Sequence, residues 1–150
     1  MISHVAYVQC RREAKGLIVR TEARIHHVRA GDLTAATGQT TGMARFAALS
    51  GASVGAQALW MGRSHVPPGT DSGPHHHGHS ETGIFVVSGN PVFAYVEDGR
   101  EARIETAPGD FVYVPPFVPH AELNPSPDEE AVVVVARTTQ EAIVGNLEHL

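Results

Sequence analysis

The sequence predicts an all-β fold, a single small β-barrel, and three observations support that prediction. Short apolar runs with strand character recur along the chain and are separated by Gly, Pro and Asp. No stretch sustains apolar residues at helical spacing for about three turns. Asp98-Gly99 joins two of the runs in the manner of a β-hairpin. The length of 150 residues fits one domain better than two.

The pattern predicts strands at residues 16–26, 54–60, 84–87, 92–96, 101–106, 111–114 and 131–136. Residues 34–48 are rich in Gly and Thr and are expected to form a loop, as are the polar residues 62–74. The run 131–136 (AVVVVA) does not alternate, so both of its faces should be buried. One face would fill the barrel and the other would meet a second sheet or a partner subunit, so we expect a homodimer.

Composition and charge exclude several classes of protein. The formal net charge is -5 with 11 Lys and Arg, which makes the chain a poor candidate for binding nucleic acid. No apolar run approaches the roughly 18–20 residues that a membrane span needs, and the first residues do not form a secretory signal. A single cysteine, Cys10, permits no intrachain disulfide and fits a cytoplasmic protein.

The histidines carry the chemistry of the sequence. Of ten in the chain, four fall within five positions, at His75, His76, His77 and His79. His75 and His77 are two residues apart, so a strand would place both imidazoles on one face. Glu81 can reach the same face after a bend at Gly78, and two histidines with one carboxylate can occupy one face of a metal ion. His77 and His79 have the same spacing, and His76 is a substitute if the register shifts.

A lone histidine, His120, follows the predicted strand 111–114 and a Pro-rich turn. A hairpin that returns toward the first histidines would bring it in as a fourth ligand. Three neutral nitrogens and one carboxylate partly neutralise a divalent cation and leave coordination positions for water, substrate or dioxygen.

These two segments resemble the two signature motifs of the cupin superfamily. The first, G-x5-H-x-H-x3 or 4-E-x6-G, is matched by Gly69, His75, His77, Glu81 and Gly89. One extra residue separates Glu81 from Gly89, and a bulge near Thr82-Gly83 would absorb it. The second, G-x5-P-x-G-x2-H-x3-N, is matched by Gly109, Pro115, His120 and Asn124, with Phe117 in place of the second glycine.

The resemblance implies one cupin-type jelly-roll barrel over residues 1–150. Its motif-bearing core would span about 69–136, and strands within 1–62 would extend the sheet. It also implies one divalent transition metal per chain, Fe(II), Mn, Ni or Zn, held at the barrel mouth by His75, His77, Glu81 and His120.

We therefore expect a metal-dependent enzyme that acts on a small organic substrate at the barrel mouth. Bound Fe(II) would favour a dioxygenase, and other metals an isomerase, lyase or decarboxylase. A cupin that binds a small ligand without catalysis is the alternative. A ligating Glu81 is not free to act as a base, so His79 and Tyr113 are the candidate acid–base residues. Phe117 and Phe85 are the candidate substrate-pocket residues, and Asn124 is expected to anchor the loop after His120.

Overall fold

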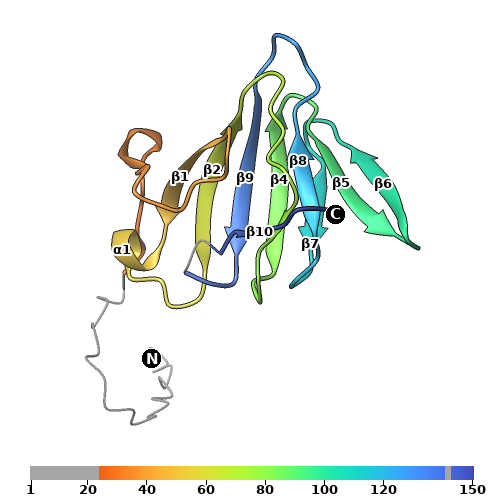
Figure 1. The fold of residues 1–150 in the computed structure, drawn as a ribbon. Helices are drawn as coiled ribbons and strands as arrows, with labels where there is room; N and C mark the ends of the chain where they lie inside the picture. The colour runs from red at the N-terminus through yellow and green to blue at the C-terminus, as the bar shows by residue number, and fades with distance from the viewer. Residues whose placement is uncertain (1–23, 141–142) are drawn as a thin grey trace, which may run out of the picture.

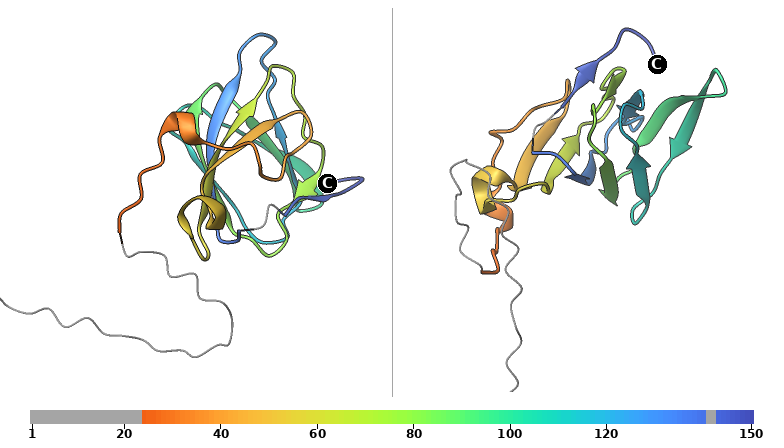
Figure 2. Two further views of the ribbon diagram at one scale, coloured as in Figure 1. Left: turned by 90° about the vertical axis from the view of Figure 1, so that its left-hand side faces the viewer. Right: turned by 90° about the horizontal axis from the view of Figure 1, so that it is seen from below.

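The computed structural model describes residues 24–140 and 143–150, and nearly all of its regular structure is β-strand. Two antiparallel five-stranded sheets curve around a shared interior (Figures 1 and 2). The first sheet has the strand order β1-β2-β9-β4-β7 and the second has the order β10-β3-β8-β5-β6. The predicted all-β jelly-roll barrel is therefore confirmed.

The first sheet contains β1 (Ala44–Leu49), β2 (Trp60–Val66), β4 (Thr82–Ser88), β7 (Phe111–Val114) and β9 (Ala131–Arg137). The second contains β3 (His75–His76), β5 (Val92–Glu97), β6 (Arg100–Glu105), β8 (His120–Leu123) and β10 (Gly145–Asn146). Helical structure in the described residues is limited to a 3-10 turn at Ala30–Asp32 and the short α1 (Gly51–Val54). Neither has the length or hydropathy to cross a bilayer.

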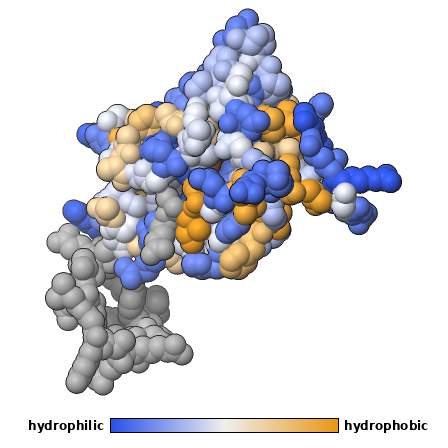
Figure 3. Space-filling view, viewed as in Figure 1, coloured by the Kyte–Doolittle hydropathy of each residue, from blue (hydrophilic) through white to orange (hydrophobic). Residues whose placement is uncertain are grey.

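Alternation along the strands of the first sheet builds the core. On β9, Ala131, Val133 and Val135 point inward and are buried, whereas Val132 and Val134 lie half-buried on the outer face. The inward residues pack with those of the facing sheet into one cluster: Ala47, Trp60, Ile84, Val86, Phe93, Val114, Val133 and Val135. Apolar side chains also reach the surface in several patches between polar ones (Figure 3).

The central and C-terminal strands follow the sequence prediction closely. The runs at 84–87, 92–96, 101–106, 111–114 and 131–136 correspond to β4, β5, β6, β7 and β9, with ends that differ by at most two residues. The hairpin between β5 and β6 is also confirmed. Asp98 and Gly99 have φ of 51° and 73°, and Glu97 pairs with Arg100. Both central residues thus adopt the left-handed conformation of a two-residue hairpin turn.

The N-terminal half differs from the prediction. Residues 54–60 do not form a strand, because α1 ends at Val54 and β2 begins only at Trp60. Residues 44–48 and 62–66, both predicted to be loop, belong to β1 and β2. The inward side of β2 holds small Gly62 and Ser64 between Trp60 and Val66, so no apolar alternation is visible in the sequence. A Cβ at Gly62 would meet the Phe46 carbonyl and the Trp60 ring.

Two predictions concern residues before the described region. Cys10 lies outside it, and so does most of the strand predicted at 16–26, of which residues 24–26 are not a strand.

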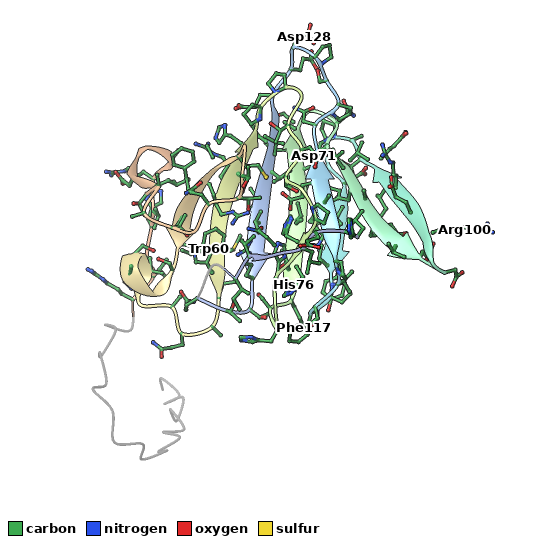
Figure 4. The ribbon with its side chains drawn as sticks, viewed as in Figure 1. Trp60, Asp71, His76, Arg100, Phe117 and Asp128 are labelled. Carbon is green, nitrogen blue, oxygen red and sulfur yellow. The ribbon has the colours of Figure 1, made fainter. Side chains whose placement is uncertain are left out.

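Asn124 anchors the loop that follows β8, as expected. Its buried side-chain amide donates hydrogen bonds to the carbonyls of Val66, at 2.9 Å, and Glu129, at 2.8 Å. Its Oδ1 accepts from the backbone N–H of Ser126 at 3.1 Å. This loop lies at the upper end of the barrel as drawn, where Asp128 is labelled (Figure 4).

Candidate metal centre

Three of the predicted histidines meet inside the barrel. His75 on β3 and His120 on β8 are directly paired positions, so their side chains share a face, and His77 follows β3 immediately. They are 0%, 3% and 1% exposed, respectively. Ring centroids lie 4.5 Å apart for His75 and His120, 4.7 Å for His77 and His120, and 5.3 Å for His75 and His77.

Each imidazole uses its Nδ1 in a hydrogen bond to the protein. Nδ1 of His75 lies 3.0 Å from the Gly73 carbonyl, and Nδ1 of His120 lies 3.0 Å from the Val118 carbonyl. A carbonyl oxygen only accepts, so in both rings Nδ1 carries the proton and Nε2 carries a free electron pair. Nδ1 of His77 lies 2.9 Å from the Thr82 hydroxyl, which can accept in the same way.

The three Nε2 atoms are buried and have no hydrogen-bond partner among the described residues. A buried polar atom without a partner costs about 1–3 kcal/mol, so three together in one place require an explanation. A metal ion would account for all three. It would take the electron pair of each Nε2, while the Nδ1 bonds fix the orientation of each ring.

A carboxylate joins the histidines from the same strand as His120. Glu122 is two residues further along β8, so it shares the inward face, and it is 4% exposed. One ligand atom each from His75, His77, His120 and Glu122 lies within 4.8 Å of the others. Ser72 holds the backbone of Glu122 in place, because its Oγ accepts from that N–H at 2.9 Å.

Glu81, the carboxylate expected from the sequence, lies outside this group. On β4 the buried, inward residues are Thr82, Ile84 and Val86, so Glu81, one residue before Thr82, is exposed. Its Oε1 instead accepts a hydrogen bond from the Tyr113 hydroxyl at 2.9 Å. The expected bulge near Thr82-Gly83 is also wrong. The irregularity falls between Val86 and Ser88, so the register at Thr82 is unbroken.

The environment of the site favours neutral imidazoles. Burial lowers the pKa of His77, and the positive charge of Arg137 lowers it further. Burial and the neighbouring His75 likewise lower the pKa of His120, against smaller effects of the Val118 carbonyl and Glu122 that raise it. Neutral imidazole is the form that binds a metal ion, so the lowered pKa values of His77 and His120 favour the form that a metal site would need.

An apolar cavity of about 270 Å³ opens beside His120. It is lined by Phe93, Tyr95, Ile104, Val112, Tyr113, Val114, Pro115, Val118 and His120. Tyr95 is the residue directly opposite His120 on β5, and Phe93 is directly opposite Glu122. The cavity therefore shares His120 with the histidine group and has mainly hydrocarbon walls, as small-molecule sites commonly do.

The other residues singled out in the sequence lie around the site but outside this histidine group. His79 is exposed in the turn before β4. The ring of His76 lies 6.0 Å from that of Phe117, which is exposed, and both are at the lower end of the barrel in Figure 4. Phe85 packs against Phe111 on the outer face of the first sheet, with centroids 4.8 Å apart. Neither Phe117 nor Phe85 lines the cavity beside His120.

Tyr113 is the exception, because it borders that cavity from β7, where its side chain is exposed. The hydrogen bond that it donates to Glu81 raises the pKa of its hydroxyl. The phenol is therefore held in its neutral form at the cavity rim.

Three residues of the site were missed in the sequence: Glu122, Thr82 and Arg137. The signal for Glu122 was present, because His120-Ala121-Glu122 has the same two-residue spacing as His75 and His77. Thr82 and Arg137 carry no such signal. Their roles depend on which strands become neighbours, and Arg137 is paired across the first sheet with both Trp60 and Thr82.

Comparisons with known proteins point to one fold. A family model described as a cupin domain matches residues 62–137, about half of the chain, and the sequence matches no curated protein. The polyketide cyclase RemF from Streptomyces resistomycificus is 20% identical, with a TM-score of 0.66 over 83% of this chain and 86% of that one.

Two further solved structures are similar. An oxalate oxidase in complex with glycolate is 20% identical, with a TM-score of 0.60 over 73% of this chain and 59% of that one. An oxalate decarboxylase from Bacillus subtilis, studied for its Mn(II) centres, is 17% identical, with a TM-score of 0.62 over 73% of this chain and 29% of that one. At these identities the likeness shows the fold and leaves the reaction open.

The lowered pKa values predict a specific pH dependence of stability. Below about pH 6.5 the unfolded chain takes up protons on His77 and His120 that the folded chain does not. The free energy of unfolding of the metal-free protein should therefore fall as the pH falls from about 7.5 to 5, by up to roughly 1.4 kcal/mol per pH unit for each imidazole. Urea unfolding at several pH values measures this slope.

The control is His79, an exposed histidine from the same segment as His77. His77→Gln should reduce the slope, and His79→Gln, at an exposed position, should leave it unchanged. A free energy of unfolding that is independent of pH between about 7.5 and 5 would contradict the assignment of neutral, buried imidazoles.

Proposed function

This chain belongs to the cupin family, and we propose that it is a metal-dependent enzyme that acts on a small organic substrate in the cavity beside His120. The observation that carries the proposal is the set of three buried, unpartnered Nε2 atoms next to a buried carboxylate. An apolar cavity adjoins the same group, so a substrate can reach it.

In this proposal His75, His77, His120 and Glu122 hold one divalent transition metal. Imidazole nitrogen with a single carboxylate suits Fe(II), Mn, Ni or Zn, so the donor set does not select one of them. The bound ion would supply Lewis-acid chemistry, with coordination positions left for an oxygen atom of the substrate or for dioxygen. Thr82, Gly73 and Val118 orient the three rings, and Ser72 orients the strand that carries Glu122.

The residues around the cavity indicate what the substrate body is like. Phe93, Val114 and Val118 provide hydrocarbon walls, which favour an apolar or aromatic group and exclude water from the reacting atoms. Tyr113 offers a neutral hydroxyl at the rim, held by Glu81. Of the two acid–base candidates, Tyr113 borders the cavity, whereas His79 is not among its lining residues.

Among the possible reactions we favour a dioxygenase. A set of histidines with one carboxylate and open positions is the arrangement that non-haem Fe(II) oxygenases use to bind substrate and dioxygen together. An isomerase, lyase or decarboxylase would need the same ligands without dioxygen, so these reactions are alternative outcomes of the activity measurement.

The first test concerns the carboxylate ligand. Glu122→Gln should lower the affinity for Co(II) or Zn(II) by at least about tenfold, because a neutral amide replaces the charged donor. Glu81→Gln, the matched change at the other carboxylate, should leave the affinity unchanged. Metal content by mass spectrometry and titration with Co(II) followed by its visible absorption measure both effects.

His77→Ala and His120→Ala extend this test to the histidines and should abolish tight binding. Loss of metal in the Glu81 variant with retention in the Glu122 variant would overturn the ligand set. Failure of the wild-type protein to bind any divalent ion would overturn the proposal as a whole.

The second test concerns the reaction. With Fe(II) bound, an aromatic or diketone substrate should cause oxygen uptake that Zn(II)-loaded protein does not show, because Zn(II) has no redox chemistry. An oxygen electrode measures uptake, and Glu122→Gln provides the inactive control. Turnover without oxygen uptake would replace the dioxygenase with a non-redox enzyme, and no turnover with any metal would favour a binding protein.

We also propose that the protein forms a homodimer through the outer face of the first sheet. Phe111 is 81% exposed there, and Tyr113 and Val87 are exposed beside it. Met61, Phe85, Phe111, Val134 and Ala136 are among the residues around a shallow apolar hollow of about 390 Å³ on this face. A continuous apolar surface of this kind is typical of an interface between subunits, and a second copy would bring the same surface to it.

Phe111→Asp should convert the dimer into a monomer, because a charge within an apolar interface is costly to bury. Light scattering coupled to size-exclusion chromatography measures the mass. Phe117→Asp is the matched control, since Phe117 is also an exposed aromatic residue but lies near His76 at the end of the barrel. A monomeric wild-type protein, or a Phe111 variant that stays dimeric, would contradict this interface.

A further inference from the structure

Arg137 ends β9 with its side chain inside the barrel, where it is 2% exposed. It is paired across the first sheet with Trp60 on β2 and Thr82 on β4, and paired positions share a face of the sheet. Its guanidinium carbon lies 5.7 Å from the centroid of the Trp60 ring. Because Thr82 holds the Nδ1 of His77, Arg137 also lies beside the proposed metal centre.

The guanidinium of Arg137 has donors without acceptors. Its Nε and Nη2 are buried and have no hydrogen-bond partner among the described residues. These two nitrogens form one edge of the guanidinium, and their parallel N–H groups match the two oxygens of a carboxylate. Burying an arginine whose Nε and Nη2 have no acceptor lowers the stability of the fold, since a buried charge is normally paired.

Arg45, in the same interior and 1% exposed, shows that the fold can pair a buried arginine when it is structural. Its Nε lies 3.3 Å from Ser64 Oγ, its Nη1 donates to the Gly38 carbonyl at 3.2 Å, and its Nη2 donates to Thr40 Oγ1 at 2.8 Å. Arg63, whose Nε is also unpartnered, is on the outer face of β2 and only half-buried. Arg137 therefore differs from both.

The charges of the interior also require an anion. Among the described residues, the buried charged side chains are Arg45, Arg137 and Glu122, two positive and one negative. A divalent metal ion would add two further positive charges, and an uncompensated excess of positive charge is unfavourable in a buried site.

We propose that Arg137 binds a carboxylate of the ligand through its bare edge, beside the metal centre, and so makes a small organic acid the preferred ligand of this protein. This inference rests on the proposed function, because it names the chemical class of ligand for the same site. Arg137 does not itself line the apolar cavity next to His120, so in this proposal the cavity takes only the hydrocarbon body of the acid, and Arg137 makes the recognition of its charge independent of the metal.

The experiment compares acids with their neutral isosteres. Benzoate and acetate are the probes, and benzamide and acetamide are the uncharged counterparts of the same shape. Trp60 is the one tryptophan of the chain, and it lies against the Arg137 guanidinium. Its fluorescence therefore reports on occupancy without any activity assay, and calorimetry provides a second measurement. Wild-type, Arg137→Gln and Arg103→Gln proteins are compared, each with Zn(II) and without metal.

We expect the wild-type protein to bind at least one of the acids roughly 10- to 100-fold more tightly than its amide, which is the effect of one charge-assisted, two-point hydrogen bond. Arg137→Gln should lose this preference and keep the Zn(II) content of the wild type. Arg103→Gln removes the same charge from an exposed position on β6 and should behave as the wild type does.

Equal affinity of the wild-type protein for acid and amide, or an unchanged preference in Arg137→Gln, would overturn the inference. A preference that vanishes when Zn(II) is removed would also overturn it, since the metal alone would then select the acid. Absence of Zn(II) from the wild-type protein would overturn the proposed function instead, and the metal-free samples would still decide the role of Arg137.

Arg137→Lys covers the case in which the glutamine variant does not fold. Lysine keeps the positive charge and lacks the two-point edge, so the preference for the acid should decrease and remain measurable. A lysine variant that binds both acid and amide as the wild type does would show that the geometry of the guanidinium has no part in recognition.

Discussion

The interior of this barrel depends on one constraint, which is that three imidazole rings are turned so that every Nε2 faces a common point without a protein partner. The protein fixes these rings from the other side, through the carbonyls of Gly73 and Val118 and the hydroxyl of Thr82. Each support is local, two residues before the ring for His75 and His120 and five residues after it for His77, so each segment orients its own ring. Because Nδ1 carries the proton in the rings of His75 and His120, their Nε2 atoms cannot form a hydrogen bond with each other.

The electrostatics of the interior follow from the same arrangement. Burial lowers the pKa values of His77 and His120, with a further contribution from Arg137, and the buried charged side chains of the described residues are two arginines and Glu122. Arg137 itself has its pKa lowered to about 10 by burial and by Arg45, with a smaller opposing effect of Glu122. It stays charged at neutral pH. An interior built in this way would suit the metal ion and the carboxylate ligand proposed above.

Strands that show apolar alternation or adjoin a clear turn signal were predicted correctly from the sequence. The prediction failed for strands whose position depends on contacts between distant segments. The hairpin at Asp98-Gly99 and the strand 111–114 follow from local chemistry. Strand β2 does not, because its inward positions include Gly62, where a Cβ would meet the Phe46 carbonyl and the Trp60 ring, and Ser64, which contacts the buried Arg45. The histidines were predictable for the same local reason. For the carboxylate, the two-residue spacing of Glu122 from His120 was a local signal, whereas Ile84 and Val86 set the register that turns Glu81 outward.

Strand β10 supports the segment that carries His75. Strand β3 has only two residues, His75 and His76, and lies between β8 and β10. The backbone of Gly145 on β10 passes so close to the His76 ring that any side chain at this position would collide with it. A substitution at Gly145 would therefore displace the neighbour of His75 and disturb the site from a position that offers no ligand atom.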